Sequence, residues 1–206
     1  MISVLQQNPW LFYAAAGIAG LLAGSFLNVV VHRLPKMMER EWRAECSRLM
    51  GAGGENLPRD TFNLILPGSA CPHCGHRISP LENIPVLSYL FLKGRCRSCR
   101  ARISWRYPLI EALSGALALV VAVHFGVTPQ AVFAILLTWA LIALTAIDYE
   151  HQLLPDDITL PLLWLGILCN MFGLYTDVYS SLFGAMGGYL GGVEAKASLL
   201  QLEAAA

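Results

Sequence analysis

The sequence predicts an all-α, multi-span transmembrane helical protein with one large polar loop. Hydrophobic residues make up 56% of the 206 residues and charged residues only 14%, a balance that is typical of membrane proteins with several spans. Apolar runs long enough to cross a bilayer recur along the chain. One segment between the first two runs holds two Cys-x-x-Cys motifs and almost all of the basic residues.

The first apolar run covers Trp10 to Val31, which is 22 residues without a formal charge. That length is sufficient for a helix that crosses the bilayer, and Trp10 and Tyr13 are placed to anchor it at the outer interface. No basic region precedes the run and no Ala-x-Ala cleavage site follows it, so a retained span is expected rather than a signal peptide. We therefore assign residues 1–32 to a first transmembrane helix.

The second segment, residues 33–108, is strongly basic. Thirteen of the fourteen Lys and Arg residues lie between Arg33 and Arg106. The segment has six acids, so its net charge is about +7 and that of the remaining chain about −7. Basic residues beside membrane spans stay on the cytoplasmic side. We expect a cytoplasmic loop domain here, with a helical signal over 36–50.

Residues 109–193 are predicted to form a transmembrane core. Its apolar runs are 109–125, 131–147, 158–176 and a short Gly-rich run from about Tyr179. If the first helix enters the cytoplasm, the second run leaves it and the third returns. Asp148, which ends the third run, is then expected at the cytoplasmic end, on the same side as the basic loop.

The loop contains the motifs Cys71-Pro-His-Cys74 and Cys96-Arg-Ser-Cys99, separated by 21 residues. Four thiolates at this spacing are typical of a closed, tetrahedral zinc site, which contributes to folding rather than to catalysis. The cytoplasm disfavours disulfides. The alternative interpretation is a pair of redox-active dithiols. We expect zinc bound by Cys71, Cys74, Cys96 and Cys99, and hence a zinc-stapled loop.

Asp148 follows seventeen uncharged residues, 131–147. A carboxylate at the end of an apolar span is a candidate functional residue. On position alone, a helix-end residue that faces interfacial water is an equal alternative. Asp156 and Asp157 follow Pro155 and precede the next apolar run, where capping of a helix N-terminus explains at least one of them.

Other polar residues within the apolar runs have structural interpretations. Ser25 and Asn28 are three residues apart, so they share one helix face that is suited to interhelical hydrogen bonds. The ladder of Gly184, Gly188 and Gly192 favours close helix packing, and Glu111 is placed to pair with an arginine of the loop. The charge of the loop is explained by topology, so no nucleic-acid partner is expected; the lipid bilayer is the expected surroundings.

Three stretches of the sequence resemble one family. The first helix ends in Leu-Ala-Gly-Ser-Phe-Leu-Asn-Val-Val-Val-His-Arg-Leu-Pro at residues 22–35. Residues 71–111 combine the cysteine motifs with Asn-Ile-Pro and Ile-Ser-x-Arg-Tyr-Pro. The third stretch is Asp148-Tyr-Glu-His-Gln-Leu-Leu-Pro-Asp. From about residue 10 to 190 the chain is similar to the type IV prepilin peptidases, bifunctional leader peptidases and N-methyltransferases of type IV pilus and type II secretion systems.

This resemblance implies an aspartic endopeptidase in the bacterial inner membrane, with Asp148 as the first of two catalytic aspartates. One carboxylate would act as a base toward water and the other as an acid, and the two would share a proton. The implied substrates are prepilins and pseudopilins, cleaved at the cytoplasmic face after a glycine that ends a short basic leader. The new N-terminus would then be methylated from S-adenosylmethionine.

The sequence departs from the family pattern in its last part. The family carries its second aspartate in a Gly-x-Gly-Asp motif, which does not occur in these 206 residues. Residues 194–206 are expected to be a tail unrelated to the family, and residues 1–206 to be a truncated, inactive peptidase. The alternatives from other classes are an inactive, membrane-tethered zinc-binding adaptor of a secretion system and a thiol oxidoreductase. Cleavage of a prepilin distinguishes the peptidase from the adaptor. Metal content distinguishes these two from the thiol oxidoreductase.

Overall fold

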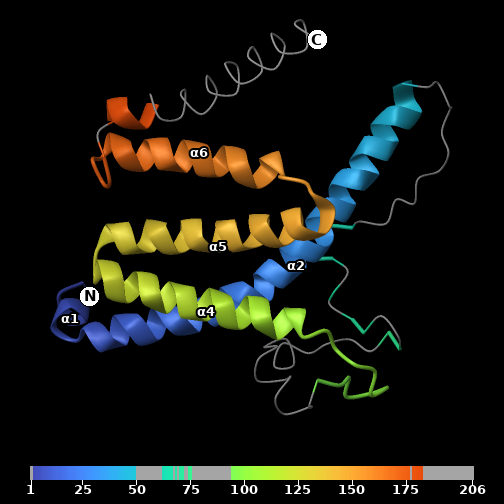
Figure 1. Cartoon of the computed structure of the whole chain (residues 1–206), viewed down its shortest axis with the longest axis horizontal. Helices are drawn as coiled ribbons and strands as arrows, with labels where there is room; N and C mark the ends of the chain where they lie inside the picture. The colour runs from blue at the N-terminus through green and yellow to red at the C-terminus, as the bar shows by residue number, and fades with distance from the viewer. Residues whose placement is uncertain are drawn as a thin grey trace, which may run out of the picture. The chain divides into compact units, whose positions relative to one another are not determined.

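The computed structural model describes residues 2–49, 94–176 and 178–182, with the short stretches 62–66, 68, 70–71 and 74–75. The helices labelled in Figure 1 are α1 (Ile2–Gln7), α2 (Pro9–Leu49), α4 (Arg106–Phe125), α5 (Pro129–His151) and α6 (Asp156–Met171). Across these described stretches there is no β-strand, and an isolated bridge joins Arg95 and Arg102. The predicted all-α class is confirmed.

Three of the described helices are long and apolar enough to cross a membrane, namely α2, α4 and α5. They belong to one compact unit, Met1–Pro155, and α6 belongs to a second, Asp156–Ala206. The predicted multi-span character is therefore confirmed. The apolar runs themselves determine these helices, because in a bilayer a backbone without internal hydrogen bonds is very costly.

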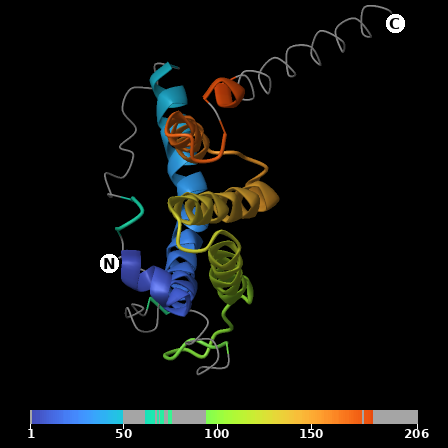
Figure 2. The same ribbon diagram turned by 90° about the vertical axis from the view of Figure 1, so that its left-hand side faces the viewer.

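Helix α2 is longer than the sequence suggests. It runs for 41 residues with Pro35 inside it, whereas residues 1–32 were assigned to the first transmembrane helix. Pro35 and Leu34 are both buried, and this packing offsets the hydrogen bond that a proline removes. Good helix formers follow, with an ion pair between Arg43 and Glu39 one turn apart. The helical signal predicted over 36–50 is thus a continuation of the first span, which extends past the start of α4 (Figures 1 and 2).

The antiparallel helices α2 and α4 pack backbone against backbone. A Cβ atom added at Gly20 would lie 2.7 Å from the Cα of Gly115, and one added at Gly24 would lie 2.6 Å from the Cα of Glu111. At the next turn of α2, the Asn28 side-chain amide donates to the backbone oxygen of Tyr107 at 3.0 Å. Small residues and an interhelical hydrogen bond are the usual means of joining helices in lipid. The glycine ladder predicted at 184, 188 and 192 lies outside the described residues.

Helices α4 and α5 are joined by a short, well-capped turn. Gly126 has a φ of 65° and its N–H donates to the oxygen of Ala122, which ends α4. Thr128 caps α5 by accepting a hydrogen bond from the N–H of Ala131, and Pro129 begins the helix. Ala118 and Ala122 of α4 then pack with Ile135 of α5 and with Ala16 of α2 in the core.

In the second unit, α6 has 16 residues, about 24 Å of helix. Asp156 and Asp157 lie in its first turn, where negative charge is favourable. The run predicted over 158–176 remains helical as far as Met171. The chain then turns, and the side-chain amide of Asn170 donates to the Ser181 hydroxyl at 3.0 Å.

Candidate functional site

The four cysteines of the two motifs lie together. The Sγ atoms of Cys71, Cys74, Cys96 and Cys99 all lie within 4.8 Å of one another, and those of Cys71 and Cys99 are 3.7 Å apart. Tetrahedral zinc with Zn–S bonds of about 2.3 Å places its sulfurs roughly 3.8 Å apart. A disulfide would need about 2.05 Å, and all six cysteines are free. The site therefore fits a tetrahedral metal ion.

Two similar backbone turns present these sulfurs. The carbonyl of Cys71 accepts from the N–H of Gly75 at 2.9 Å, and the carbonyl of Cys96 accepts from the N–H of Arg100 at 3.0 Å. Gly75 and Arg100 both have left-handed backbone angles, with φ of 70° and 57°. Each turn thus closes at the residue that directly follows its second cysteine. This local geometry follows from the Cys-x-x-Cys spacing, which is why the sequence predicts the site.

The second turn is joined closely to α4. The N–H of Cys96 donates to the oxygen of Ala101 and that of Ile103 donates to the oxygen of Gly94, both at 2.8 Å. The chain then reaches α4 directly, which begins at Arg106. Cys96 is buried, whereas Cys74 and Cys99 are exposed. The metal-binding part of the loop therefore leaves the bundle at the N-terminal end of α4.

The other cysteines of the cluster affect the protonation of Cys99. A hydrogen bond with the backbone of Ala101 lowers the pKa of the Cys99 thiol, but loss of hydration and the neighbouring cysteine sulfurs raise it to about 11. Like an ordinary thiol, Cys99 therefore keeps its proton near neutral pH when no cation is bound. A bound divalent metal reverses the balance, because a coordinating thiol loses its proton.

Asp148 lies exposed in the last turn of α5. Its backbone oxygen accepts from the N–H of Gln152 at 2.8 Å, and Gln152 closes the helix with a φ of 50°. Its neighbour Ile147 is fully buried, so the helix is anchored on one face while Asp148 faces outward. The sequence predicted this helix-end position.

An ion pair joins this end of α5 to α4. Arg106, the first residue of α4, pairs with Glu150, two residues after Asp148. The turn that bears Asp148 therefore lies at the end of the bundle from which the metal-binding loop leaves. The sequence alone did not reveal this pair. The one available sign was that both residues lie in stretches that resemble the prepilin peptidases, Arg106 in Ile-Ser-x-Arg-Tyr-Pro and Glu150 in the stretch that begins at Asp148. Glu111, predicted to pair with a loop arginine, is fully buried against Gly24 of α2.

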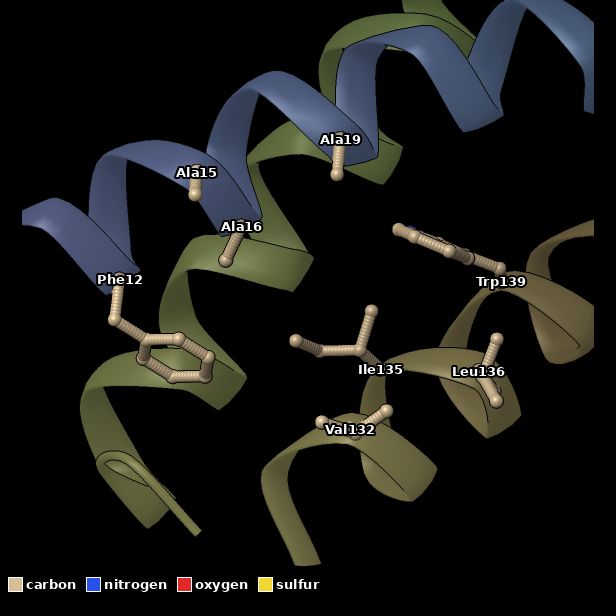
Figure 3. Close-up of a pocket in the computed structure, with 8 residues that line it drawn as sticks. All are labelled: Phe12, Ala15, Ala16, Ala19, Val132, Ile135, Leu136 and Trp139. Atoms are coloured by element: carbon tan, nitrogen blue, oxygen red, sulfur yellow. The ribbon is translucent and has the colours of Figure 1, made fainter. Parts of the chain in front are cut away.

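A groove of about 240 Å³ lies between α2 and α5 (Figure 3). Apolar side chains line it: Phe12, Ala15, Ala16, Ala19, Val132, Ile135, Leu136 and Trp139. It includes the first half of α5, away from the turn that carries Asp148. The indole Nε1 of Trp139 is buried and has no hydrogen-bond partner among the described residues. The lining contains no acid, base or nucleophile, so the groove adds no chemistry to the site.

Two family models match the chain. The family model described as the bacterial peptidase A24 N-terminal domain matches residues 18–125, and that of the type IV leader peptidase family matches residues 135–197. No solved structure matches the chain.

Relatives named prepilin leader peptidase/N-methyltransferase are similar over most of the chain. The protein from Pseudomonas aeruginosa is 54% identical over 191 residues, which cover 92% of this chain and 65% of the relative. Those from Aeromonas hydrophila and Dichelobacter nodosus are each 50% identical over 92% of this chain, and over 66% and 67% of the relative. The chain thus spans about two thirds of the length of these relatives. It belongs to the type IV leader peptidase family.

Proposed function

We propose that this chain is the larger part of a membrane-embedded aspartic endopeptidase that removes the leader peptide from prepilins and pseudopilins. One observation carries the proposal: Asp148 is an exposed carboxylate at the end of an apolar span, inside the segment that matches the type IV leader peptidase family. A carboxylate held at the edge of the bilayer meets both water and a peptide that emerges from the membrane. The names of the relatives support this substrate class.

In this mechanism Asp148 is one of two carboxylates that activate a water molecule. As a base it takes a proton from water, which attacks the scissile carbonyl, while the second carboxylate donates a proton to the leaving amine. Two neighbouring carboxylates are not both charged, because like charges repel. They share one proton, so one of them stays in the acid form. No Gly-x-Gly-Asp motif occurs in residues 1–206, so we propose that these residues alone do not cleave.

We further propose that cleavage takes place at the cytoplasmic face of the inner membrane. Basic residues beside membrane spans stay in the cytoplasm, and residues 33–108 form a basic loop beside the first span. The ion pair of Arg106 with Glu150 supports placing Asp148 on the same side as that loop. A substrate with a basic leader would be held on this side by the same rule.

The proposal also includes a zinc ion and a second activity, N-methylation. Zinc is the proposed ion, held by Cys71, Cys74, Cys96 and Cys99, because four soft thiolates at tetrahedral distances suit it. With four protein ligands it has no open position, so its role is to fold the loop. From the names of the relatives, we propose that the mature N-terminus is then methylated with S-adenosylmethionine as donor.

Prepilin processing in membranes tests the proposal. The assay compares the 206-residue chain with a longer form that also carries the Gly-x-Gly-Asp segment of a full-length relative. The longer form is expected to cleave, and Asp148→Asn in it to abolish cleavage while its zinc content stays unchanged, since the change removes the base but keeps the shape. Normal cleavage by residues 1–206 alone, or by the Asp148→Asn form, would overturn the two-aspartate mechanism.

A further inference from the structure

We infer that Arg106 and Glu150 are positioning residues, which fix the last turn of α5, and with it the Asp148 carboxylate, against the first turn of α4. The inference rests on the catalytic role proposed for Asp148. In this assignment neither residue contacts the attacking water or the scissile peptide bond. Their ion pair bridges two helices through residues far apart in the sequence.

The turn that carries Asp148 needs such a restraint. The last carbonyls of a helix have no partners within it, so terminal turns open easily. Tyr149 is 89% exposed. His151 is also exposed, and its Nε2 lies 3.9 Å from Glu150 of the same turn, a contact that does not tie the turn to another helix. The hydrogen bond from Gln152 to the Asp148 oxygen closes it, but it depends on a left-handed residue that is not glycine. A catalytic carboxylate requires a better-defined position than this turn provides alone.

The first turn of α4 is a suitable reference for that position. The hydrogen bond from Asn28 to the Tyr107 oxygen fixes it to α2 at 3.0 Å. One turn later, Glu111 is fully buried against Gly24. The guanidinium of Arg106 therefore projects from a backbone that is already held against α2. Its pairing with Glu150 transfers this rigidity to α5.

The placement of the two charges argues against a merely stabilising surface pair. Arg106 lies in the first turn of α4 and Glu150 in the last turn of α5. The helix dipole disfavours a positive charge at a helix N-terminus and a negative charge at a C-terminus, so each residue is at the unfavourable end of its helix. The Arg106 and Glu150 side chains are only 39% and 23% exposed. By contrast, Arg43 and Glu39 are 74% and 57% exposed and lie one turn apart on α2. The exposed pair fixes no second element and serves as a matched control.

The first experiment measures cleavage kinetics in the longer form defined above. Arg106→Ala and Glu150→Ala are each expected to lower kcat roughly ten- to a hundredfold, the range that a misplaced catalytic group costs, while KM changes by less than about twofold. The double exchange Arg106→Glu with Glu150→Arg restores the pair and puts each charge at the helix end that favours it. It is expected to recover most of the lost kcat. The control Arg43→Ala is expected to leave kcat unchanged.

The second experiment measures hydrogen exchange in the 206-residue chain, where no activity is needed. The N–H of Gln152 reports the last turn of α5 directly, because it donates to the Asp148 oxygen. Arg106→Ala is expected to raise its exchange rate about tenfold or more, as expected for a terminal turn that opens locally, and Arg43→Ala is expected not to. Zinc content shows that the loop remains folded in both variants.

The outcomes separate this inference from the proposed function. Full activity of Arg106→Ala beside an inactive Asp148→Asn form overturns the positioning role and leaves the peptidase mechanism intact. A double exchange no more active than the single variants also overturns it, because the residues then do not act as a pair. Cleavage by Asp148→Asn overturns both. Unchanged exchange at Gln152 in Arg106→Ala shows that the pair does not hold the turn.

Discussion

At the scale of single residues, the sulfur cluster depends on backbone geometry as much as on ligand chemistry. Each Cys-x-x-Cys turn is closed by a hydrogen bond from the residue after its second cysteine, Gly75 in one and Arg100 in the other. Cys96 is the buried member of the set, and its own N–H and oxygen both take part in the second turn. A change of its side chain therefore removes the buried sulfur of the cluster.

We predict that Cys96→Ser eliminates bound metal. A hydroxyl is a far weaker zinc ligand than a thiolate, and three remaining cysteines leave the site open. Elemental analysis of the purified protein is expected to fall from about one zinc per chain to near zero, with faster proteolysis of the loop. Cys46→Ser is the matched control, because Cys46 is also free but lies exposed on α2. Equal zinc in the two variants would refute the four-cysteine site.

At the scale of elements, the contact between α2 and α4 has no space for a side chain at Gly24. The Cβ of an alanine there would lie 2.6 Å from the Cα of Glu111, and a backbone atom cannot move aside as a flexible side chain can. At Gly17, about two helical turns earlier, an added Cβ meets nothing within 4 Å. The same substitution therefore has opposite consequences at two positions of one helix.

Gly24→Ala is predicted to destabilise the protein by about 1–3 kcal/mol, the usual cost of overpacking. Gly17→Ala is predicted to be neutral or to stabilise by up to about 1 kcal/mol through helix propensity. Denaturation of both variants in detergent, followed by circular dichroism, compares them directly. Equal stability of the two variants would mean that α2 and α4 are not in close contact.

At the scale of the whole molecule, the charge distribution and the helix ends suggest a single topology. Reporter fusions at Glu55 and Gln152 are predicted to give cytoplasmic signals, and a fusion at Gly126 a signal from the far side, because α4 and α5 each cross once. Gly126 lies in the turn that joins these two helices. Opposite signals from Glu55 and Gln152 would exclude this topology.

The sequence predicted the features that depend on local pattern. Apolar runs predicted the spans because lipid requires continuous helices, and the spacing of Cys71 with Cys74 and of Cys96 with Cys99 predicted their cluster. The continuation of α2 beyond Pro35 was missed, since the burial that compensates a proline is a tertiary property. The pairing of Arg106 with Glu150 was missed for the same reason. The catalytic role of Asp148 stays a prediction.

The turn geometry at the cysteines also bears on charge balance. Four thiolates around a divalent cation carry a net charge of about −2. Arg95, Arg97, Arg100 and Arg102 lie within or directly beside the second turn. The arginines that a topological count assigns to membrane orientation would therefore also balance the negative charge of a metal bound by these four cysteines. Arg100 adopts the left-handed conformation that Gly75 adopts in the first turn, and this conformation costs a residue other than glycine about 1–2 kcal/mol. In return, the second turn has a positive charge directly beside Cys99.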